Sequence, residues 1–333
     1  MADRDVRRLD EDDVRVRPGR GTRPRSKQRP SHADARPGLV TTVDRGRYTV
    51  LIDRVEVNAM RARELGRKGV AVGDRVAVVG ELSGDPDALA RIVRIEERDT
   101  VLRRTADDTD PFERVVVANA DQMVIVASLA DPPPSYGLID RCLVAALTAD
   151  IEPILLLTKS DLAPPDEALE RYSELDVQAL VTQRGADLAS IRQMLAGHAS
   201  VLVGHSGVGK STLINALVPD ANRATGIVSA IGKGRHTSSA AIALPLPGGD
   251  GWVIDTPGVR SFGLAHVTAD DLLWAFPDLE EAAVRCPPGC EHLSAEAGCT
   301  LDSWVAAGNS SPERLAAFRR LLASRVGGQP AAQ

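Results

Sequence analysis

The strongest chemical signal in the sequence is a glycine-rich segment that follows the apolar run Val201–Val203. Its residues are Gly204, His205, Ser206, Gly207, Val208, Gly209, Lys210, Ser211 and Thr212. They fit the pattern G-x-x-x-x-G-K-[ST], in which backbone N–H groups and the start of a helix converge on phosphate oxygens. Lys210 would hold the β- and γ-phosphates and Ser211 would bind Mg²⁺. The segment therefore predicts a nucleoside triphosphate site.

A second polar motif, Asp255-Thr-Pro-Gly258, follows the apolar run Trp252–Ile254. In open parallel sheets, ligands bind beyond the carboxyl ends of the strands. Asp255 would orient Mg²⁺ through a water molecule, and the N–H of Gly258 would contact the γ-phosphate. Such a tetrapeptide can be an ordinary turn, but its place after a strand favours a second part of the phosphate site.

A third motif, after the apolar run Ile154–Leu157, indicates which base is bound. Its residues are Thr158, Lys159, Ser160 and Asp161. A carboxylate accepts two hydrogen bonds at once, so Asp161 suits the N1–H and the N2 amino group of guanine, which adenine cannot supply. Lys159 would pack its stem along the base. The expected ligands are GTP and GDP with Mg²⁺.

Three cysteines and a histidine stand close together near the C-terminus, at Cys286, Cys290, His292 and Cys299. Three thiolates and one imidazole make the closed tetrahedral donor set of a structural zinc ion. In a reducing compartment such a cluster favours metal over disulfides. The alternative is a set of free, partly buried thiols. The fourth cysteine, Cys142, lies on an apolar helical face and is interpreted as a core residue.

Composition narrows the class of protein. The 333 residues carry 40 basic and 46 acidic side chains, a net charge of −6, which argues against a protein that coats polyanions with its whole surface. No apolar run approaches the roughly 18–20 residues that cross a bilayer. The N-terminus lacks the apolar stretch of a signal peptide. We therefore expect a cytoplasmic monomer that does not bind membranes.

The positive charge gathers near the N-terminus. Between Val14 and Gly38 the chain has eight Lys or Arg residues and one acid, Asp34. With almost nothing apolar to bury, residues 1–37 are expected to form a disordered basic arm. Such an arm binds phosphates through counterion release, or it is a solubilising tail without a fixed partner.

Residues 38–105 are predicted to form an N-terminal OB-fold β-barrel that binds RNA. The pattern consists of five short β-branched runs, at Leu39–Val43, Tyr48–Ile52, Val55–Val57, Arg75–Val79 and Ile92–Ile95. Small barrels of this kind bind oligonucleotides, although many serve only as spacers. Arg98, Arg103 and Arg104 would extend a basic face or form a solvated edge.

Residues 111–265 are predicted to be an α/β domain. Continuous apolar runs alternate there with helical patterns, which indicates a parallel sheet covered on both faces. Residues 266–325 contain the Cys/His cluster and a final helix with Ser311 as N-cap and Pro312 at its first position. A small helical zinc-binding domain is expected there, followed by a disordered tail at 326–333.

The order of the motifs is unusual, because the base motif at Thr158–Asp161 precedes the phosphate loop at Gly204–Thr212. With a barrel before it and a Cys/His cluster after it, the chain resembles the RsgA (YjeQ/EngC) family of circularly permuted small ribosomal subunit biogenesis GTPases over residues 38–325. The resemblance implies a P-loop GTPase core. It also implies binding to the small ribosomal subunit and its rRNA, and GTP hydrolysis stimulated by that subunit during its late maturation.

The resemblance further implies a mobile switch at Gly234–Ser239. There Thr237 would close on Mg²⁺ and take part in catalysis together with Lys210; Ser238 is the alternative. Val259 stands where Ras-like GTPases carry a water-orienting glutamine, so hydrolysis by the free protein should be slow. His236 is the candidate for orienting the water, with a purely structural loop role as the alternative.

The chain departs from the family pattern at the base motif, where Thr158 replaces the usual asparagine. Threonine lacks the carboxamide that touches guanine and braces the phosphate loop, so guanine preference should rest on Asp161, with GTP still preferred over ATP. The second base-contact motif is expected at Val181–Gln183. Two rival functions are an RNA-binding module without meaningful turnover and an ATP-using P-loop kinase. Intact Lys210, Ser211 and Asp255 favour an enzyme over the RNA-binding module. Asp161 and the absence of an evident acceptor site argue against the kinase.

Overall fold

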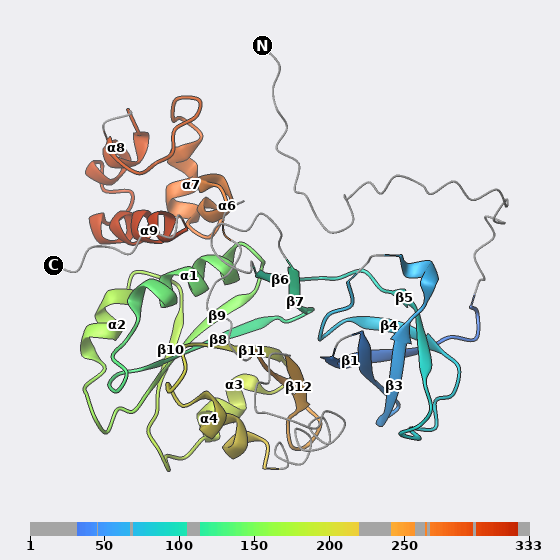
Figure 1. The fold of residues 1–333 in the computed structure, drawn as a ribbon. Helices are drawn as coiled ribbons and strands as arrows, with labels where there is room; N and C mark the ends of the chain where they lie inside the picture. Colours follow the sequence, from blue (N-terminus) through green and yellow to red (C-terminus); the bar gives the residue numbers. More distant parts are fainter. Residues whose placement is uncertain are drawn as a thin grey trace.

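The computed structural model describes residues 32–44, 46–66, 69–104, 114–219, 241–256, 264, 267–295 and 298–325. Figure 1 shows these residues as a small β-barrel, a central sheet flanked by helices, and a group of short helices beside that sheet. Most of the predicted basic arm and the whole predicted tail at 326–333 lie outside the described residues.

The N-terminal strands form a closed five-stranded barrel. The strands are β1 (Arg36–Asp44), β2 (Arg47–Ile52), β3 (Val55–Arg61), β4 (Arg75–Val79) and β5 (Ala90–Ile95), with the one-turn helix η1 (Arg63–Leu65) after β3. Their order is β1-β2-β3-β5-β4, and pairing of β1 with β4 closes the ring. Alternate residues such as Tyr48, Val50 and Ile52 point into the barrel core. The predicted OB-type barrel is confirmed.

The central sheet has the predicted α/β architecture. Its strands, in spatial order, are β10 (Gln178–Val181), β9 (Glu152–Thr158), β8 (Gln122–Ser128), β11 (Ala199–Val203), β13 (Trp252–Asp255) and β12 (Ile242–Pro245). The first five are parallel, and β12 is antiparallel to β13. The helices α1 (Tyr136–Leu147) and α2 (Asp166–Tyr172) cover one face, and α3 (Ala189–Leu195) and α4 (Lys210–Leu217) the other (Figure 1). Cys142 is fully buried in α1, as predicted.

Four strands were not predicted from the sequence. They are β10, β12 and the antiparallel pair β6 (Val101–Arg104) and β7 (Arg114–Ala118). Each is short, and β10 and β6 lack a run of buried residues, so periodicity gives no signal for them. Strand β12 also pairs with β1 of the barrel, with Thr42 opposite Ile242, which makes the barrel and the central sheet one continuous sheet.

The C-terminal helices share a hydrophobic core with the central domain. They are α6 (Ala269–Leu273), α7 (Pro277–Ala283), α8 (Thr300–Ala306) and α9 (Pro312–Ser324). The Ser311 hydroxyl accepts the Arg314 N–H, and Pro312 is the first residue of α9, which confirms the predicted cap. Phe276 and Phe318 meet edge to face at 5.2 Å and belong to the same core as Leu143 of α1. None of the helices in the described ranges is long and apolar enough to span a membrane.

The loop that contains Gly73 and Asp74 packs against the segment that leads from the barrel into the central domain. Asp74 is fully buried and pairs with Arg98 through two bonds, Nε–Oδ1 at 2.7 Å and Nη2–Oδ2 at 2.9 Å. The Arg98 side chain therefore forms a structural ion pair with a buried carboxylate, which corrects its assignment to a basic or solvated edge. Gly73 has a φ of +87°, and a Cβ there would lie 2.0 Å from the carbonyl oxygen of Ala118.

We expect Gly73→Ala to destabilise the protein more than Gly46→Ala. Both glycines have a left-handed φ, +87° and +86°, but a Cβ on Gly46 would meet nothing within 4 Å. Both variants lose roughly 1–2 kcal/mol to backbone strain, and only Gly73→Ala adds the clash, about 2 kcal/mol more. Thermal and urea unfolding of both variants measures the difference. Equal destabilisation would contradict a close-packed junction.

Candidate functional site

The carboxyl ends of the parallel strands bring the predicted motifs to one edge of the central sheet. Leu202 of β11 is opposite Asp255 of β13, and Ser128 of β8 is opposite Thr158 of β9. The phosphate loop, Asp255 and the base motif therefore leave the sheet at the same edge, although they are far apart in the chain. This edge is the ligand-binding edge of an open α/β sheet.

The phosphate loop fits closely against β8. Gly204 has a φ of +147°, and a Cβ there would lie 2.2 Å from the carbonyl oxygen of Val126. Helix α4 begins at Lys210, where the motif predicts the start of a helix, and Gly209 is its N-cap. The Lys210 ammonium donates hydrogen bonds to the carbonyl oxygens of Gly204 and His205, across the mouth of the loop. The cation is thus already held over the loop where phosphate oxygens would bind.

Lys210 and Asp255 share a desolvated environment. Burial lowers the pKa of Lys210, while the charge of Asp255 works in the opposite direction. Burial likewise raises the pKa of Asp255, against the effect of Lys210. Thr256, next in the chain, is buried and donates its hydroxyl to the carbonyl oxygen of Leu202 at 2.8 Å, which ties the end of β13 to β11. Bound phosphates and a cation would supply these two charges with partners.

The base motif is braced to the phosphate loop by its threonine. The Thr158 hydroxyl is buried and lies 2.7 Å from the carbonyl oxygen of Val208 in the loop and 3.3 Å from that of Ala127 in β8. The expectation that threonine cannot brace the loop is therefore wrong. A hydroxyl reaches the loop carbonyl that faces it, although it supplies no carboxamide for the base.

The segment after β10 lies beside the base motif. The Ser160 N–H donates to the carbonyl oxygen of Thr182 at 3.3 Å, and the Ser160 hydroxyl lies 3.5 Å from Oε1 of Gln183. The Thr182 hydroxyl is buried without a hydrogen-bond partner among the described residues. Sequence analysis pointed to Val181–Gln183 without identifying Thr182, because a hydroxyl that lacks a partner is visible only in the folded chain.

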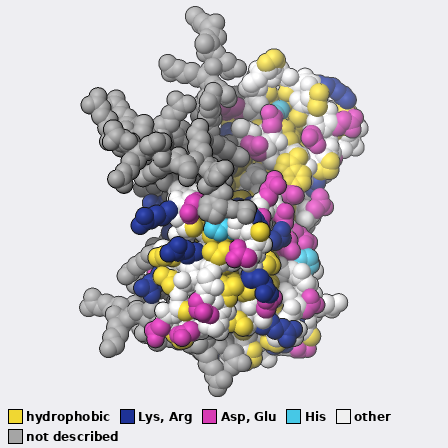
Figure 2. Space-filling model, turned by 90° about the vertical axis from the view of Figure 1, so that its right-hand side faces the viewer, with side chains coloured by type: hydrophobic (Ala, Val, Ile, Leu, Met, Phe, Trp, Pro, Cys, Tyr) yellow, Lys and Arg dark blue, Asp and Glu magenta, His cyan; other side chains and the backbone are white. Residues whose placement is uncertain are grey.

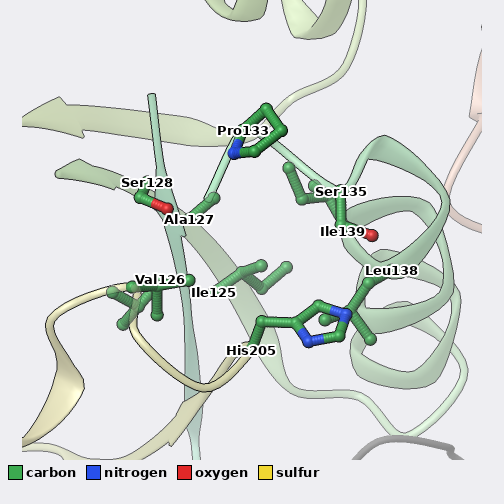
Figure 3. A pocket seen from close by; sticks show the side chains of 11 residues that line it. Ile125, Val126, Ala127, Ser128, Pro133, Ser135, Leu138, Ile139 and His205 are labelled. Atoms are coloured by element: carbon green, nitrogen blue, oxygen red, sulfur yellow. The ribbon is translucent and has the colours of Figure 1, made fainter. Parts of the chain in front are cut away.

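His205 lies at the other side of the loop entrance. Its exposed side chain lines a shallow pocket together with Leu138 and Ile139 of α1 and the end of β8 (Figure 3). Its carbonyl oxygen, not its ring, accepts the hydrogen bond from Lys210. His205 and the first turn of α1 thus line the same pocket.

Several predicted site residues lie outside the described residues. They are Gly258, the switch Gly234–Ser239 with His236 and Thr237, and Val259. Ser211 is the second residue of α4, and Asp161 follows β9 at the exposed edge. The predicted roles of all these residues stay predictions.

The Cys/His cluster has the dimensions of a tetrahedral metal site. The ligand atoms of Cys286, Cys290, His292 and Cys299 all lie within 4.8 Å of one another. His292 Nδ1 is 3.5, 3.6 and 3.6 Å from the three sulfur atoms, and the sulfurs of Cys286 and Cys299 are 4.0 Å apart. Zinc with ordinary Zn–S and Zn–N bonds would place these pairs about 3.6 and 3.8 Å apart. The donor set therefore fits zinc.

Neighbouring residues orient the ligands. The Thr300 hydroxyl lies 2.9 Å from the sulfur of Cys286, and the Thr300 N–H donates to the same sulfur. Arg319 of α9 donates to the carbonyl oxygen of His292 at 3.0 Å and pairs with Asp302 of α8. Burial lowers the pKa of His292, which favours the neutral imidazole that a metal requires. Sequence analysis missed Thr300 and Arg319 because their spacing matches no ligand motif.

Comparisons with known proteins agree with this arrangement. A family model described as RsgA GTPase matches residues 95–265. A small ribosomal subunit biogenesis GTPase RsgA from Chlorobaculum tepidum is 37% identical over 270 residues, covering 78% of this chain and 86% of the relative. A protein of the same name from Ectopseudomonas mendocina is 41% identical over 219 residues, 63% of each chain.

Two solved structures share the fold. The crystal structure of YloQ, described as a circularly permuted GTPase, matches with a TM-score of 0.62 and 25% identity over 92% of this chain and all of that one. YjeQ from Thermotoga maritima matches with a TM-score of 0.61 and 24% identity over 89% of this chain and all of that one.

We expect the purified protein to hold one zinc ion per chain, measured by elemental analysis. Cys290→Ser should lose most of the metal and unfold at a lower temperature, because a closed site contributes its binding energy to folding. Cys142→Ser is the matched control for zinc content, since that thiol is not one of the four clustered ligands. Less than about a third of an equivalent of zinc in the unsubstituted protein would count against the site.

Proposed function

The chain belongs to the RsgA GTPase family and is therefore a GTP hydrolase of ribosome biogenesis, and we propose that the small ribosomal subunit stimulates its turnover. The observation that supports this is the meeting of three motifs at one sheet edge: the phosphate loop, Asp255 and the base motif. Each motif alone has an ordinary structural explanation. Three ordinary turns would not explain why all three motifs lie at the same edge of the sheet.

We propose that Lys210 and Ser211 divide the work on the phosphates. Lys210 is already positioned by the carbonyl oxygens of Gly204 and His205, and it would exchange these partners for β- and γ-phosphate oxygens. Ser211 and Asp255, with Thr237 from the switch, would hold Mg²⁺ directly or through water. Bound Mg²⁺ would neutralise charge on the transferring phosphoryl group. The backbone N–H of Gly258 would donate a hydrogen bond to the γ-phosphate.

Base recognition is assigned to the loops after β9 and β10. Asp161 would accept both N–H groups of the guanine edge. The unpartnered hydroxyl of Thr182 belongs to the segment that hydrogen-bonds Ser160, the residue before Asp161. We assign Thr182 to orienting the Asp161 carboxylate or to contacting the base, since a buried hydroxyl without a partner costs about 1–3 kcal/mol. Lys159, held by the carbonyl oxygen of Asp131, would flank the base.

The attacking water needs a residue that Val259 cannot provide. His236 is our candidate, because an imidazole can hydrogen-bond water. Because His236 belongs to the predicted switch, GTP hydrolysis would be slow until a partner positions its imidazole. That partner is the small ribosomal subunit.

Contact with rRNA is assigned to the barrel. Arg47, Met60 and Arg91 lie opposite one another on β2, β3 and β5 and are exposed. The guanidinium groups of Arg47 and Arg91 can contact phosphates on either side of the apolar Met60 side chain. Figure 2 shows basic and acidic side chains interspersed over the barrel face, so the surface would select an RNA shape rather than bind any polyanion. A cytoplasmic monomer suits this role.

Hydrolysis of GTP and of ATP, each with and without small ribosomal subunits, tests the proposal. We expect slow GTP turnover alone, at least tenfold faster turnover with subunits, and negligible ATP turnover. Lys210→Ala should lower the stimulated rate by about 100-fold, because it removes a charge that stabilises the transition state. Phosphate release is the readout.

Two results would contradict the proposal. Tight GTP binding without turnover under any condition would favour the RNA-binding module, and ATP turnover comparable to GTP turnover would favour the kinase. Full subunit-stimulated turnover in His236→Ala would dismiss the role of that histidine alone.

Asp161→Asn should change the preferred base. The amide keeps one acceptor for N1–H but presents an N–H to the base, so guanine loses a charged hydrogen bond while xanthine, with a carbonyl at C2, gains one. We expect the affinity for GDP to fall about 100-fold. The variant should then bind xanthosine diphosphate more tightly than GDP. Fluorescence titration with both nucleotides measures this. Unchanged GDP affinity would remove Asp161 from the base site.

A further inference from the structure

A buried carboxylate joins the nucleotide-binding domain to the C-terminal helices. Asp140 of α1 is only 3% exposed. Its Oδ1 accepts the hydroxyl of Tyr172 at 3.0 Å, and its Oδ2 lies 3.6 Å from Arg171 of α2 and 3.5 Å from Arg320 of α9. One carboxylate thus faces two guanidinium groups from two different parts of the molecule.

The aromatic rings around Asp140 hold both arginines in place. Arg171 stacks over Tyr136 at 4.6 Å and Arg320 over Tyr172 at 5.5 Å, and Arg320 donates to the carbonyl oxygen of Arg171. Burial and the Asp140 charge raise the pKa of Tyr172, so its hydroxyl stays protonated and donates. Stacked guanidinium planes and a fixed carboxylate define one relative position of α1 and α9. The surrounding apolar core is less directional.

The residue next to Arg320 reaches the metal cluster. Arg319 donates to the carbonyl oxygen of the ligand His292 at 3.0 Å and forms two bonds with Asp302. Two consecutive arginines of α9 therefore contact opposite partners: Arg319 the metal loop, and Arg320 the carboxylate of α1. A shift of α9 relative to α1 moves both.

The first turn of α1, directly before Asp140, lies beside the phosphate loop. Leu138 and Ile139, in its first turn, line the same pocket as Gly204 and His205 of the phosphate loop (Figure 3). Asp140 follows directly in the chain. The helix that carries the buried carboxylate is therefore also the helix that packs beside the entrance of the phosphate loop.

We propose that Asp140 is a positioning residue that couples the nucleotide site to the Cys/His metal site, so that nucleotide binding strengthens metal retention. The coupling runs through α1, the Asp140–Arg320 pair and Arg319 to His292. It rests on the proposed nucleotide and zinc sites. By linkage, zinc must strengthen nucleotide binding by the same factor.

The test measures how fast a chromogenic chelator withdraws zinc from the full-length protein, with and without saturating GDP. We expect GDP to slow zinc withdrawal at least threefold in the unsubstituted protein and to have no effect in Asp140→Asn, which keeps the shape but loses the charge. Arg320→Met, which removes the partner on α9, should behave in the same way. Activity does not enter the readout.

Asp278→Asn is the matched control. It removes a carboxylate that pairs with Arg314, a residue of α9 that touches neither Asp140 nor the metal ligands, so the GDP effect should persist. A GDP effect retained in both Asp140→Asn and Arg320→Met would overturn the proposal, as would no GDP effect in the unsubstituted protein.

GDP affinity is measured first by fluorescence titration. A protein that fails to bind GDP contradicts the proposed function, and one that binds GDP without slowing zinc loss contradicts the coupling alone. If Asp140→Asn is too unstable to purify, Arg320→Met carries the comparison, because it leaves Asp140 paired with Arg171 and Tyr172.

Discussion

The structure depends on one constraint of parallel sheets: all strands of such a sheet end on the same side. Here β8, β9, β11 and β13 deliver their carboxyl ends to one edge, whatever their order in the chain. The chain reaches the base motif first and the phosphate loop later, yet both arrive at the same place. A circular permutation keeps the site intact because neighbours in the sheet, not neighbours in the sequence, determine it.

The sequence predicted those features whose causes are local. Continuous apolar runs marked β8, β9, β11 and β13, glycine and lysine spacing marked the phosphate loop, and Ser311–Pro312 marked the start of α9. Short spacing also predicted the Cys/His cluster. What could not be predicted joins distant segments. The hydrogen bond from Thr158 to Val208 spans 50 residues and the Asp74–Arg98 pair spans 24, and neither leaves a periodic pattern.

The C-terminal helices illustrate the same limit. The sequence predicts a small helical zinc-binding domain at 266–325, and the structure shows that Phe276, Leu279 and Phe318 belong to one core with Leu143 of the central domain. A unit of about 60 residues buries only about 60% of the surface of its unfolded chain and has marginal stability alone. The metal site and the shared core would both add stability to this unit. The metal would order the loops that carry its ligands, and the shared core orders the helices. The nucleotide-binding domain is therefore part of what stabilises the metal site.

The threonine in the base motif shows that two tasks of the motif are separable. An asparagine at this position would brace the phosphate loop and contact the base with the same side chain. Thr158 keeps the first task, with its hydroxyl 2.7 Å from the carbonyl oxygen of Val208, and gives up the second. Base discrimination then falls on Asp161 and the neighbouring loop with Thr182. Because the brace is a buried hydrogen bond between strand end and loop, its loss would affect the binding of any nucleotide, whereas a change at Asp161 would affect only the choice of base.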